Sequence, residues 1–395
     1  MYGLSSTRQF SLTMRRSARL ARRGDARDVD EFPDVEFNDM FLNAFPEVMT
    51  DEEPDHGLLK PRIYNPQSSS WEPHSNQDIT HKKGDLLKVV SWKLFPSASS
   101  LAAVRASAAI DHLRNMFGQK PDNLVVMPQE IREESLDAIL KNEWAQQNFI
   151  LSDTEPPYSE YKFDQFDDFD EGKGDLESNQ CFSMTMVSRN LPISNCSRVS
   201  FFSGTNCDAL VVDVPVSESE GHGPKISKQS LRLCTTRLEP NYSNPDLRRS
   251  QLVTVSELLN GKWSQGQQTL GGLVGGNMGP LAVSERHIHR DPEIGLMNVW
   301  ENRPAPVPPT VKPSRNDERS KARADAWTFH PDRKRHERKL DKFLYIGSIE
   351  TVTLDEAENK TRKMGRFGRD WKTQAGSKKV CVSEHSGIMV GIKVA

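Results

Sequence analysis

From Asp85 onward, short apolar runs of strand length alternate with helical patterns and clusters of turn residues. The runs LLKVVSW and DNLVVMPQE have the length and the β-branched content of strands. Between them, residues 99–117 place apolar side chains near helical spacing behind Ser100, a candidate N-terminal cap. The regular part of the chain is therefore expected to begin with a β-α-β unit.

Six later segments continue the strand pattern, several of them with alternating or fully apolar sequences. They are CFSMTMVSR, DALVVDVPV, LRLCTTRLE, LGGLVGG, KFLYIGSIE and SGIMVGIKVA. Only two further helices are indicated, at residues 135–147 and 249–261. Many strands with few helices predict an α/β fold in which two packed sheets carry helices on their outer faces.

Residues 1–84 lack a sustained apolar pattern and are segregated by charge. Residues 1–24 carry six arginines and no acid, whereas residues 25–60 carry twelve acids against Arg27 and Lys60. The whole chain is only 35% hydrophobic and has a mean hydropathy of -0.65, so part of its length is unable to bury itself. We expect residues 1–84 to form a largely irregular tail and residues 85–395 to form one domain.

The arginine-rich segment MRRSARLARR leaves three interpretations open. It fits an organelle transit peptide, which would direct the chain to the mitochondrion, a basic nuclear-import signal, or a solvated arm. The five cysteines form no CxxC pair and four of them lie in or beside apolar runs, which favours buried thiols in a reducing, intracellular compartment.

Two inserts interrupt the expected domain. Residues 151–180 are acidic and aromatic, while residues 301–328 open with a proline-rich run and then become basic. We interpret both as exposed loops. No apolar run approaches the length that a membrane span requires, so an integral membrane protein is excluded.

Polar residues gather where the expected strands end. No GxxxxGK[ST], GxGxxG, HExxH or GxSxG motif occurs, which argues against the simplest nucleotide-binding, zinc-protease and α/β-hydrolase sites. Instead SWKLF, PQE, TTRLE, GGNMGP and SEHSGI each follow or precede an apolar strand. In two-sheet proteins such strand ends are where a site assembles.

The order of these segments resembles the successive motifs of the endonuclease/exonuclease/phosphatase superfamily. The segments are VVSWKLF, LVVMPQEI, LRLCTTRLE, GGLVGGNMGP, RKLDKFLY and VSEHSGIMVGIKV. They are most similar to the 5′-tyrosyl-DNA phosphodiesterase-like branch with its fungal relatives, over about residues 86–395. The resemblance implies a four-layered sandwich of two mainly antiparallel sheets flanked by helices, the DNase I-like fold, with the site at one end.

The resemblance also implies a chemistry: Mg²⁺-dependent cleavage of phosphoesters such as those linked to DNA. It assigns Glu130 to the metal, His385 to phosphate contact, and Glu239 and Asp341 to supporting positions. The expected partners are a phosphoester or a nucleic acid, bound by a monomer.

Five positions depart from the pattern. The superfamily has Asn, His, Asp, Asn and Asp where this chain has Lys93, Arg237, Asn277, Gly279 and Glu384. An ammonium at position 93 would repel Mg²⁺ or take its place against a carboxylate. An amide at position 277 cannot accept a proton from water, and the side chain at position 384 reaches one methylene too far. A guanidinium at position 237, however, binds phosphate well.

Three functional hypotheses follow. The first is an enzyme in which Glu130, Glu239, Asp341, Glu384 and His385 still assemble a Mg²⁺ site, with activity and metal binding weakened by the substitutions. The second is a metal-free pocket in which Lys93 and Arg237 bind a phosphate group or nucleic acid. The third is an interaction scaffold that uses the acidic and proline-rich loops.

Overall fold

The computed structural model describes most of the unit Pro54–Ala395. The described residues are 56–75, 80–94, 101–157, 181–201, 203, 207–218, 229–262, 264, 266–279, 285–301, 328, 340–352, 354, 366–368, 372–376 and 378–395. The basic and acidic segments up to residue 55, and most of the inserts at 151–180 and 301–328, lie outside these ranges. Within the described residues, no helix has the length and apolar character needed to traverse a bilayer.

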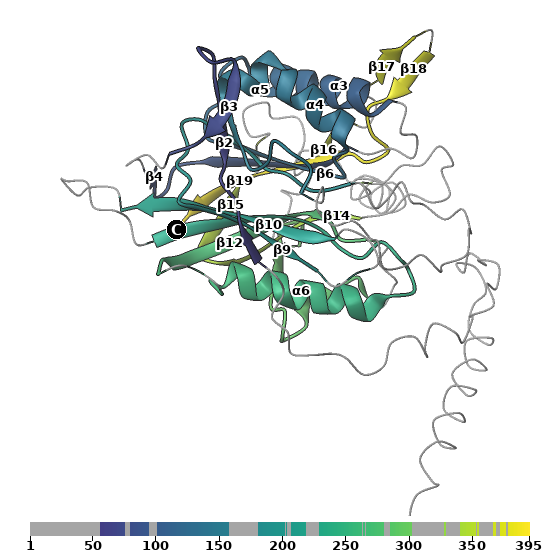
Figure 1. The fold of residues 1–395 in the computed structure, drawn as a ribbon. Coiled ribbons are helices and arrows are strands. Elements are labelled where there is room, and N and C mark those ends of the chain that lie inside the picture. Colours follow the sequence, from purple (N-terminus) through teal and green to yellow (C-terminus); the bar gives the residue numbers. More distant parts are fainter. Residues whose placement is uncertain are drawn as a thin grey trace, which may run out of the picture. The chain divides into compact units, whose positions relative to one another are not determined.

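Two sheets form the centre of the unit (Figure 1). In order across the first sheet, the strands are β15 (Ile349–Val352), β19 (Gly387–Val394), β5 (Leu87–Lys93), β6 (Leu124–Gln129), β8 (Met186–Ser188), β7 (Phe149–Leu151), β2 (Arg62–Asn65) and β3 (Ser70–Pro73), with β16 (Arg366–Phe367) beside β19. In the second they are β1 (His56–Leu58), β9 (Asn195–Ser200), β10 (Asp208–Ser217), β11 (Gln229–Arg237), β12 (Gln268–Asn277), β14 (Asp341–Gly347) and β13 (Met297–Asn298), with β4 (His81–Lys82) beside β10. A separate hairpin joins β17 (Lys372–Ala375) and β18 (Lys378–Cys381).

Helices cover the outer face of each sheet. Figure 1 shows α3 (Ala102–Phe117), α4 (Glu133–Lys141) and α5 (Glu143–Asn148) over the first sheet, and α6 (Pro245–Leu259) over the second. Most strand pairs are antiparallel; β5–β6, β11–β12 and β4–β10 are parallel. The expected four-layered α/β sandwich of two mainly antiparallel sheets is therefore confirmed.

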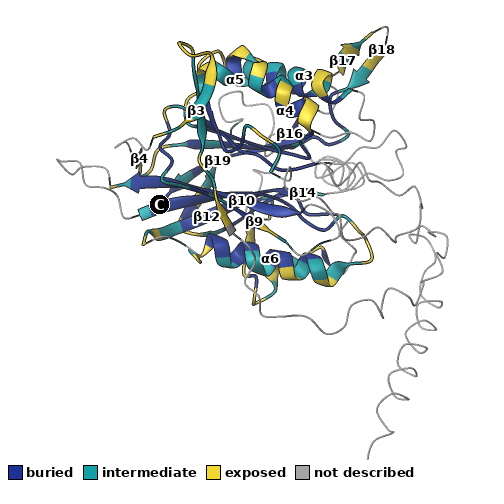
Figure 2. Ribbon diagram, viewed as in Figure 1, coloured by how far each residue is buried: buried dark blue, intermediate teal, exposed yellow. Residues whose placement is uncertain are grey.

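The sheets pack through apolar residues that share one face. Leu87 and Val89 of β5 meet Leu233 of β11 and Leu273 of β12 in the core between the sheets. Figure 2 shows most of the strands of the two sheets as buried. On the outside, α3 buries Ala106, Ala109, Ile110 and Leu113, which lie on one side of a helix of 3.6 residues per turn. Four of the five cysteines are buried, as expected.

Two expected elements differ from those observed. The helix expected at 135–147 is broken at Asn142, which is extended and whose side chain accepts a hydrogen bond from the Ala145 backbone N–H, so that it caps α5. The segment 342–350 was expected to be one strand but divides at Ser348 into β14 and β15, which lie in different sheets. Gly347, at a φ of 81°, supplies the left-handed turn that this crossing needs.

The irregular tail expected up to residue 84 is wrong for residues 56–58, 62–65, 70–73 and 81–82, which form strands. Strand β1 pairs with β9, and β2 pairs with β7 and β3. Leu59 and Ile63 pack against the core between the sheets, while the Trp71 indole donates a hydrogen bond to the Leu140 carbonyl. These strands are short and half-exposed, so they carry little of the apolar periodicity by which strands are detected in a sequence.

A pair of truncations tests this boundary. A chain that begins at Pro54 should unfold cooperatively, whereas one that begins at Asp85 should lose about 3 kcal/mol or more of unfolding free energy, because β7 and β9 each lose one of their two partner strands and apolar contacts are removed. Urea denaturation of both chains measures the difference. Equal stability would show that residues 54–84 do not belong to the fold.

Candidate functional site

The ends of five strands converge on one region between the sheets. Lys93 ends β5 and is paired in register with Gln129, the last residue of the parallel strand β6, so Glu130 follows at the same edge. In the second sheet, Asn277 is the register partner of both Arg237 and Asp341. Side chains paired across neighbouring strands point to the same face, so these three polar groups form a row.

Glu130 joins the two sheets electrostatically. Its Oε1 lies 2.9 Å from Lys93 Nζ and 3.0 Å from Arg237 Nε. The Glu130 and Arg237 side chains are only 6% and 8% exposed, and that of Lys93 is 18% exposed. A carboxylate that is buried in this way is stable only if it is paired, and here two cations share one oxygen.

These charges decide the protonation of the pair. Burial pushes the pKa of the Glu130 carboxyl upward, but the positive charges of Lys93 and Arg237 outweigh burial, so the pKa lies below the ordinary value of 4.5. Burial likewise lowers the pKa of Arg237, but the negative charge of Glu130 more than compensates and the pKa is raised. Both groups are therefore charged at neutral pH.

The backbone at Glu130 is held in an unusual conformation. Its φ is 55°, which is uncommon for a residue with a side chain. The neighbouring Ile131 exchanges backbone hydrogen bonds with Phe182, which fixes the chain on leaving the strand. A strained residue of this kind persists only where its surroundings hold it, and strained residues concentrate at functional sites.

Gln129 makes a second polar connection between the sheets. Its side-chain amide donates to Ser91 Oγ at 3.0 Å on β5 and to Thr235 Oγ1 at 2.9 Å on β11. Gln129 is fully buried. This bridge fixes the spacing of the two sheets directly beneath Glu130.

His385 and Asp341 form a buried pair in the same region. His385 Nδ1 lies 2.7 Å from Asp341 Oδ2, and His385 is near enough to contribute to the electrostatics of Glu130. The Trp92 indole donates to the His385 carbonyl at 3.0 Å, and Ser383 Oγ donates to the Lys93 carbonyl at 2.6 Å. The chain before β19 is thereby attached to the end of β5, and the Asp341 carboxylate orients the imidazole.

Asn277 and Gly279 form a tight turn in place of a catalytic loop. Asn277 Oδ1 accepts a hydrogen bond from the Gly279 backbone N–H at 2.8 Å, so the amide caps its own loop. Gly279 has a φ of 73°, and a Cβ there would lie 2.6 Å from the Glu239 carbonyl oxygen. The larger residue that the superfamily has at this position does not fit the observed backbone.

The Glu239 carboxylate contacts groups outside this cluster, and Glu384 interacts with a residue of α3. The Glu239 carboxylate accepts hydrogen bonds from the Ser203 hydroxyl and, at 2.9 Å, from the Asn241 backbone N–H. Glu384 is half-buried and acts electrostatically on Arg105 of α3. Of the eight residues predicted for the site, the structure thus gathers Lys93, Glu130, Arg237, Asn277, Asp341 and His385.

Three further residues lie at the site although no sequence motif indicated them: Thr328, Cys181 and Arg132. Thr328 accepts hydrogen bonds from the backbone N–H groups of residues 340 and 341 through its hydroxyl, and its carbonyl accepts one from residue 386. Cys181 is buried beside Glu130 and interacts with Arg132, and burial raises the pKa of its thiol. Thr328 and Cys181 reach the site through contacts between segments far apart in the chain, which no local motif reports.

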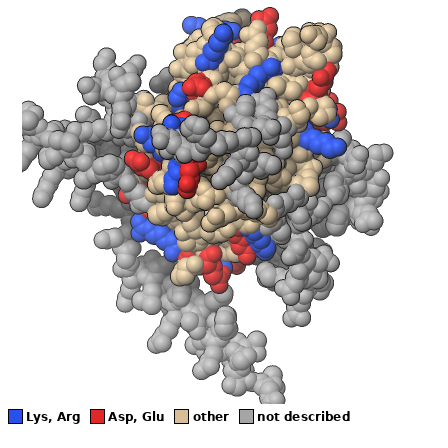
Figure 3. Space-filling view, turned by 90° about the vertical axis from the view of Figure 1, so that its left-hand side faces the viewer, with Lys and Arg blue, Asp and Glu red and all other residues tan. Residues whose placement is uncertain are grey.

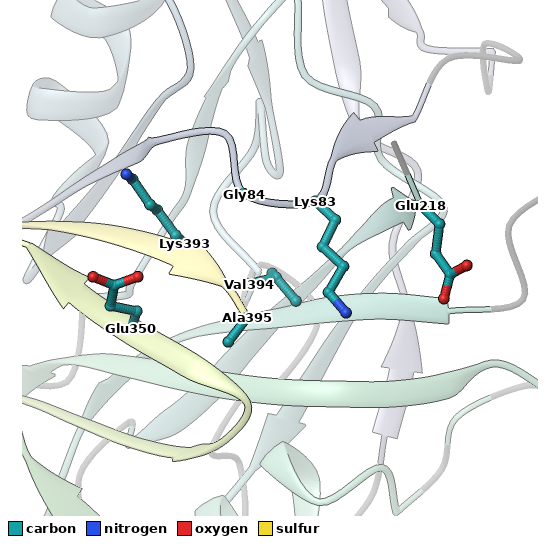
Figure 4. A pocket seen from close by; sticks show the side chains of 7 residues that line it. All are labelled: Lys83, Gly84, Glu218, Glu350, Lys393, Val394 and Ala395. Atoms are coloured by element: carbon teal, nitrogen blue, oxygen red, sulfur yellow. The ribbon is translucent and has the colours of Figure 1, made fainter. Parts of the chain in front are cut away.

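A different pocket lies at the other end of the sheets. It has a volume of about 480 Å³ and is lined by Lys83, Glu218, Glu350 and Lys393 together with residues 84, 394 and 395 (Figure 4). Figure 3, which views the molecule from the side of the C-terminus, shows basic and acidic side chains intermixed among the described residues. The pocket contains lysines and glutamates in equal number and no group of the predicted site.

Comparisons with known proteins give a match at the level of three-dimensional structure only. No family model and no curated protein sequence matches the chain. A Bacteroides thetaiotaomicron endonuclease/exonuclease/phosphatase family protein superposes with a TM-score of 0.50 and 10% identity, covering 79% of this chain and 99% of that one. The chain has the endonuclease/exonuclease/phosphatase fold.

Two other similar structures are a D. rerio TDP2 humanised by 14 mutations and the human nocturnin catalytic domain with a bound sulfate. The first has a TM-score of 0.49 and 15% identity, and covers 78% of this chain and 99% of its own. The second has a TM-score of 0.47 and 12% identity, and covers 87% of this chain and 97% of its own.

Proteins with the endonuclease/exonuclease/phosphatase fold are expected to use Mg²⁺, but the residues present here do not fit the ion. Mg²⁺ needs oxygen ligands in octahedral geometry, usually including one or two carboxylates. The nearest candidate, Glu130, already has two cations on one oxygen, and the Asp341 carboxylate is engaged by His385. Among the residues that the structure describes, no group of three His, Cys, Asp or Glu ligands occurs at this site.

The first prediction from this geometry concerns the metal. We expect Mg²⁺ to bind the unmodified chain no more tightly than about 1 mM, and the double variant Lys93→Asn/Arg237→His to bind at least about tenfold more tightly, because both competing cations are removed. Isothermal titration with Mg²⁺ measures this, with Lys88→Asn on the same strand as the matched control. A micromolar affinity of the unmodified chain that is lost in Glu130→Ala would refute the prediction.

The second prediction concerns pH. Because the pKa of Glu130 is lowered in the folded state, its ion pairs contribute fully above about pH 4.5 and are lost as the pH falls through the folded-state pKa. At pH 7, Glu130→Gln should therefore reduce the unfolding free energy by about 3 kcal/mol. This difference should shrink towards zero as the pH is lowered below 4.5. A difference that does not change with pH would mean that the charge of Glu130 is not what stabilises the site.

Proposed function

We propose that this chain is a phosphoesterase-like protein that binds a phosphate group without a metal ion and hydrolyses phosphoesters weakly or not at all. The observation that carries the proposal is the contact of both Lys93 Nζ and Arg237 Nε with one oxygen of Glu130. In the resemblance drawn from the sequence, that carboxylate holds Mg²⁺. Here two side-chain cations supply the positive charge that the ion would otherwise provide.

The charge balance of the site favours an anionic ligand. Lys93 and Arg237 provide two cations against the one carboxylate of Glu130, while the carboxylate of Asp341 is paired with His385. Arg237 Nη1 is buried and has no hydrogen-bond partner in the described part of the chain. A buried donor without a partner is costly, and a phosphate oxygen would satisfy it with a charge-assisted hydrogen bond.

The same site lacks the groups that hydrolysis requires. The Asn277 amide cannot act as a general base, and its oxygen is already engaged by the Gly279 N–H. His385, oriented by Asp341, is the remaining group of the cluster able to transfer a proton, and its Nδ1 is already engaged by the Asp341 carboxylate. We therefore expect the site to bind and position a phosphate group but not to promote the attack of water on phosphorus.

The class of ligand follows from the sequence resemblance to the 5′-tyrosyl-DNA phosphodiesterase-like branch. It points to a phosphate on a DNA strand or on another ester, which a phosphate-binding cluster at the end of the sheets would recognise by charge. We further propose that the protein is a monomer in solution and that it is located inside the cell, in the nucleus or the mitochondrion.

Phosphate binding in EDTA tests this function. We expect inorganic phosphate and a 5′-phosphorylated oligonucleotide to bind without Mg²⁺. Lys93→Gln should weaken binding about tenfold through loss of a charge-assisted contact, whereas Glu130→Gln should tighten it because the competing carboxylate is neutralised. Titration calorimetry measures all three proteins, and Lys88→Gln serves as the control.

The opposite response of Glu130→Gln distinguishes this proposal from the enzyme hypothesis. A Mg²⁺-dependent phosphoesterase would lose its activity in that variant, since the metal would lose its carboxylate ligand. Mg²⁺-dependent hydrolysis of a phosphodiester by the unmodified chain, abolished by Glu130→Gln, would therefore overturn the proposal.

A further inference from the structure

A second cluster of titratable side chains, His287, His289 and Glu301, comes from the segments on either side of β13 and lies away from the candidate site. The short 3-10 helix η5 (Ile288–Arg290) carries His289 and follows directly after His287, and Glu301 lies three residues beyond β13. Lys342 acts electrostatically on His289. Asp341 faces the first sheet, where it contacts His385. Its neighbour Lys342 points to the opposite face of the second sheet, because side chains alternate along a strand. The cluster, on which Lys342 acts, therefore lies on the opposite side of the second sheet from His385.

The ligand atoms of this cluster converge on one carboxylate. His289 Nε2 lies 3.0 Å from Glu301 Oε2, and His287 Nδ1 lies 3.5 Å from Glu301 Oε1. The three ligand atoms all lie within 4.8 Å of one another, and no other group of three His, Cys, Asp or Glu residues in the described ranges does so.

We propose that His287, His289 and Glu301 form a binding site for a divalent transition-metal ion, with Zn²⁺ the best match. Imidazole nitrogen and carboxylate oxygen are ligands that Zn²⁺ prefers, and three protein ligands with a water in the fourth position are a common arrangement. Tetrahedral ligands about 2.0–2.1 Å from Zn²⁺ are spaced about 3.3 Å apart. The separation of His287 Nδ1 from Glu301 Oε1, 3.5 Å, is close to that value, and the three ligand atoms lie within 4.8 Å of one another.

The backbone positions two of the three ligands before any ion arrives. His289 is 1% exposed, and its carbonyl accepts a hydrogen bond from the Leu296 N–H at 2.8 Å. The Glu301 N–H donates to the Asn298 carbonyl at 3.0 Å. Preorganised ligands lose little entropy when they bind a metal, and the side chain of His287, which is 63% exposed, is able to adjust to the ion.

Few interactions have to be displaced. His289 Nδ1 is buried and has no partner within the described residues, so Glu301 is the only polar contact of that ring there. Arg290 donates to Glu301 Oε2 from Nη2 at 2.9 Å and from Nε at 3.2 Å, which leaves Oε1 directed at His287. Glu301 is therefore able to bind the ion through Oε1 while Oε2 stays with Arg290, whose charge opposes the metal and limits its affinity.

Titration of the full chain with Zn²⁺ tests the site. The titration uses a Cys381→Ser background, because Cys381 is the one half-exposed thiol among the five cysteines. We expect one Zn²⁺ to bind with micromolar affinity, and binding to weaken at least about tenfold in His287→Ala and in Glu301→Gln, since each removes one ligand. His287 is exposed, so its replacement should leave the fold intact. His74→Ala, outside the cluster, should have no effect.

Two further results decide the proposal. Arg290→Gln should tighten Zn²⁺ binding, an effect that a cluster with a purely structural role would not produce. X-ray absorption should show two imidazole ligands at about 2.0 Å. Absence of Zn²⁺ binding at high micromolar concentration, or binding that is unchanged in both His287→Ala and Glu301→Gln, would overturn the proposal.

Discussion

One buried carboxylate with two cations on it governs the candidate site. Glu130 follows a strand of the first sheet, while Arg237 ends a strand of the second, so their ion pair spans the interface between the sheets. Removing Glu130 would leave the largely buried Arg237 guanidinium without its carboxylate, which costs more than the net value of the pair itself. The left-handed backbone of Glu130, the Gln129 bridge beneath it and the anchoring of the chain before β19 to β5 together hold this arrangement in place.

The fold and the chemistry of the site have separate origins. The two sheets need only matched apolar faces, and those remain intact from Leu87 to Val394. The site depends on a few side chains at strand ends, where a substitution changes charge without disturbing the core. In the proposed account, Lys93 and Arg237 take the place that the resemblance gives to a metal ion, and Asn277 stands where the resemblance implies a base. A fold shared with phosphoesterases therefore does not by itself imply their reaction.

Most strands of the two sheets can be predicted from the sequence, and the elements and contacts that were not predicted have physical causes. Strands such as β5, β6 and β11 are fully apolar or alternate, and their order identified the fold. Contact of Lys93 with the Glu130 carboxylate was one of two alternatives that the resemblance implied, and the structure has that contact. The strands before residue 82 were missed because they are short and half-exposed, and the roles of Thr328 and Arg132 were missed because their contacts join segments far apart in the chain. The hydrogen bonds that engage Glu239 could be found only in three dimensions.

The most direct test of the central claim is anomalous diffraction from crystals of the unmodified chain soaked in millimolar Mn²⁺, which has the same preference for oxygen ligands as Mg²⁺. If Lys93 and Arg237 occupy the position of the metal, no manganese peak should appear beside Glu130, and both side chains should remain in contact with its carboxylate. A manganese peak within about 2.5 Å of the Glu130 carboxylate, with Lys93 and Arg237 displaced from it, would contradict the account.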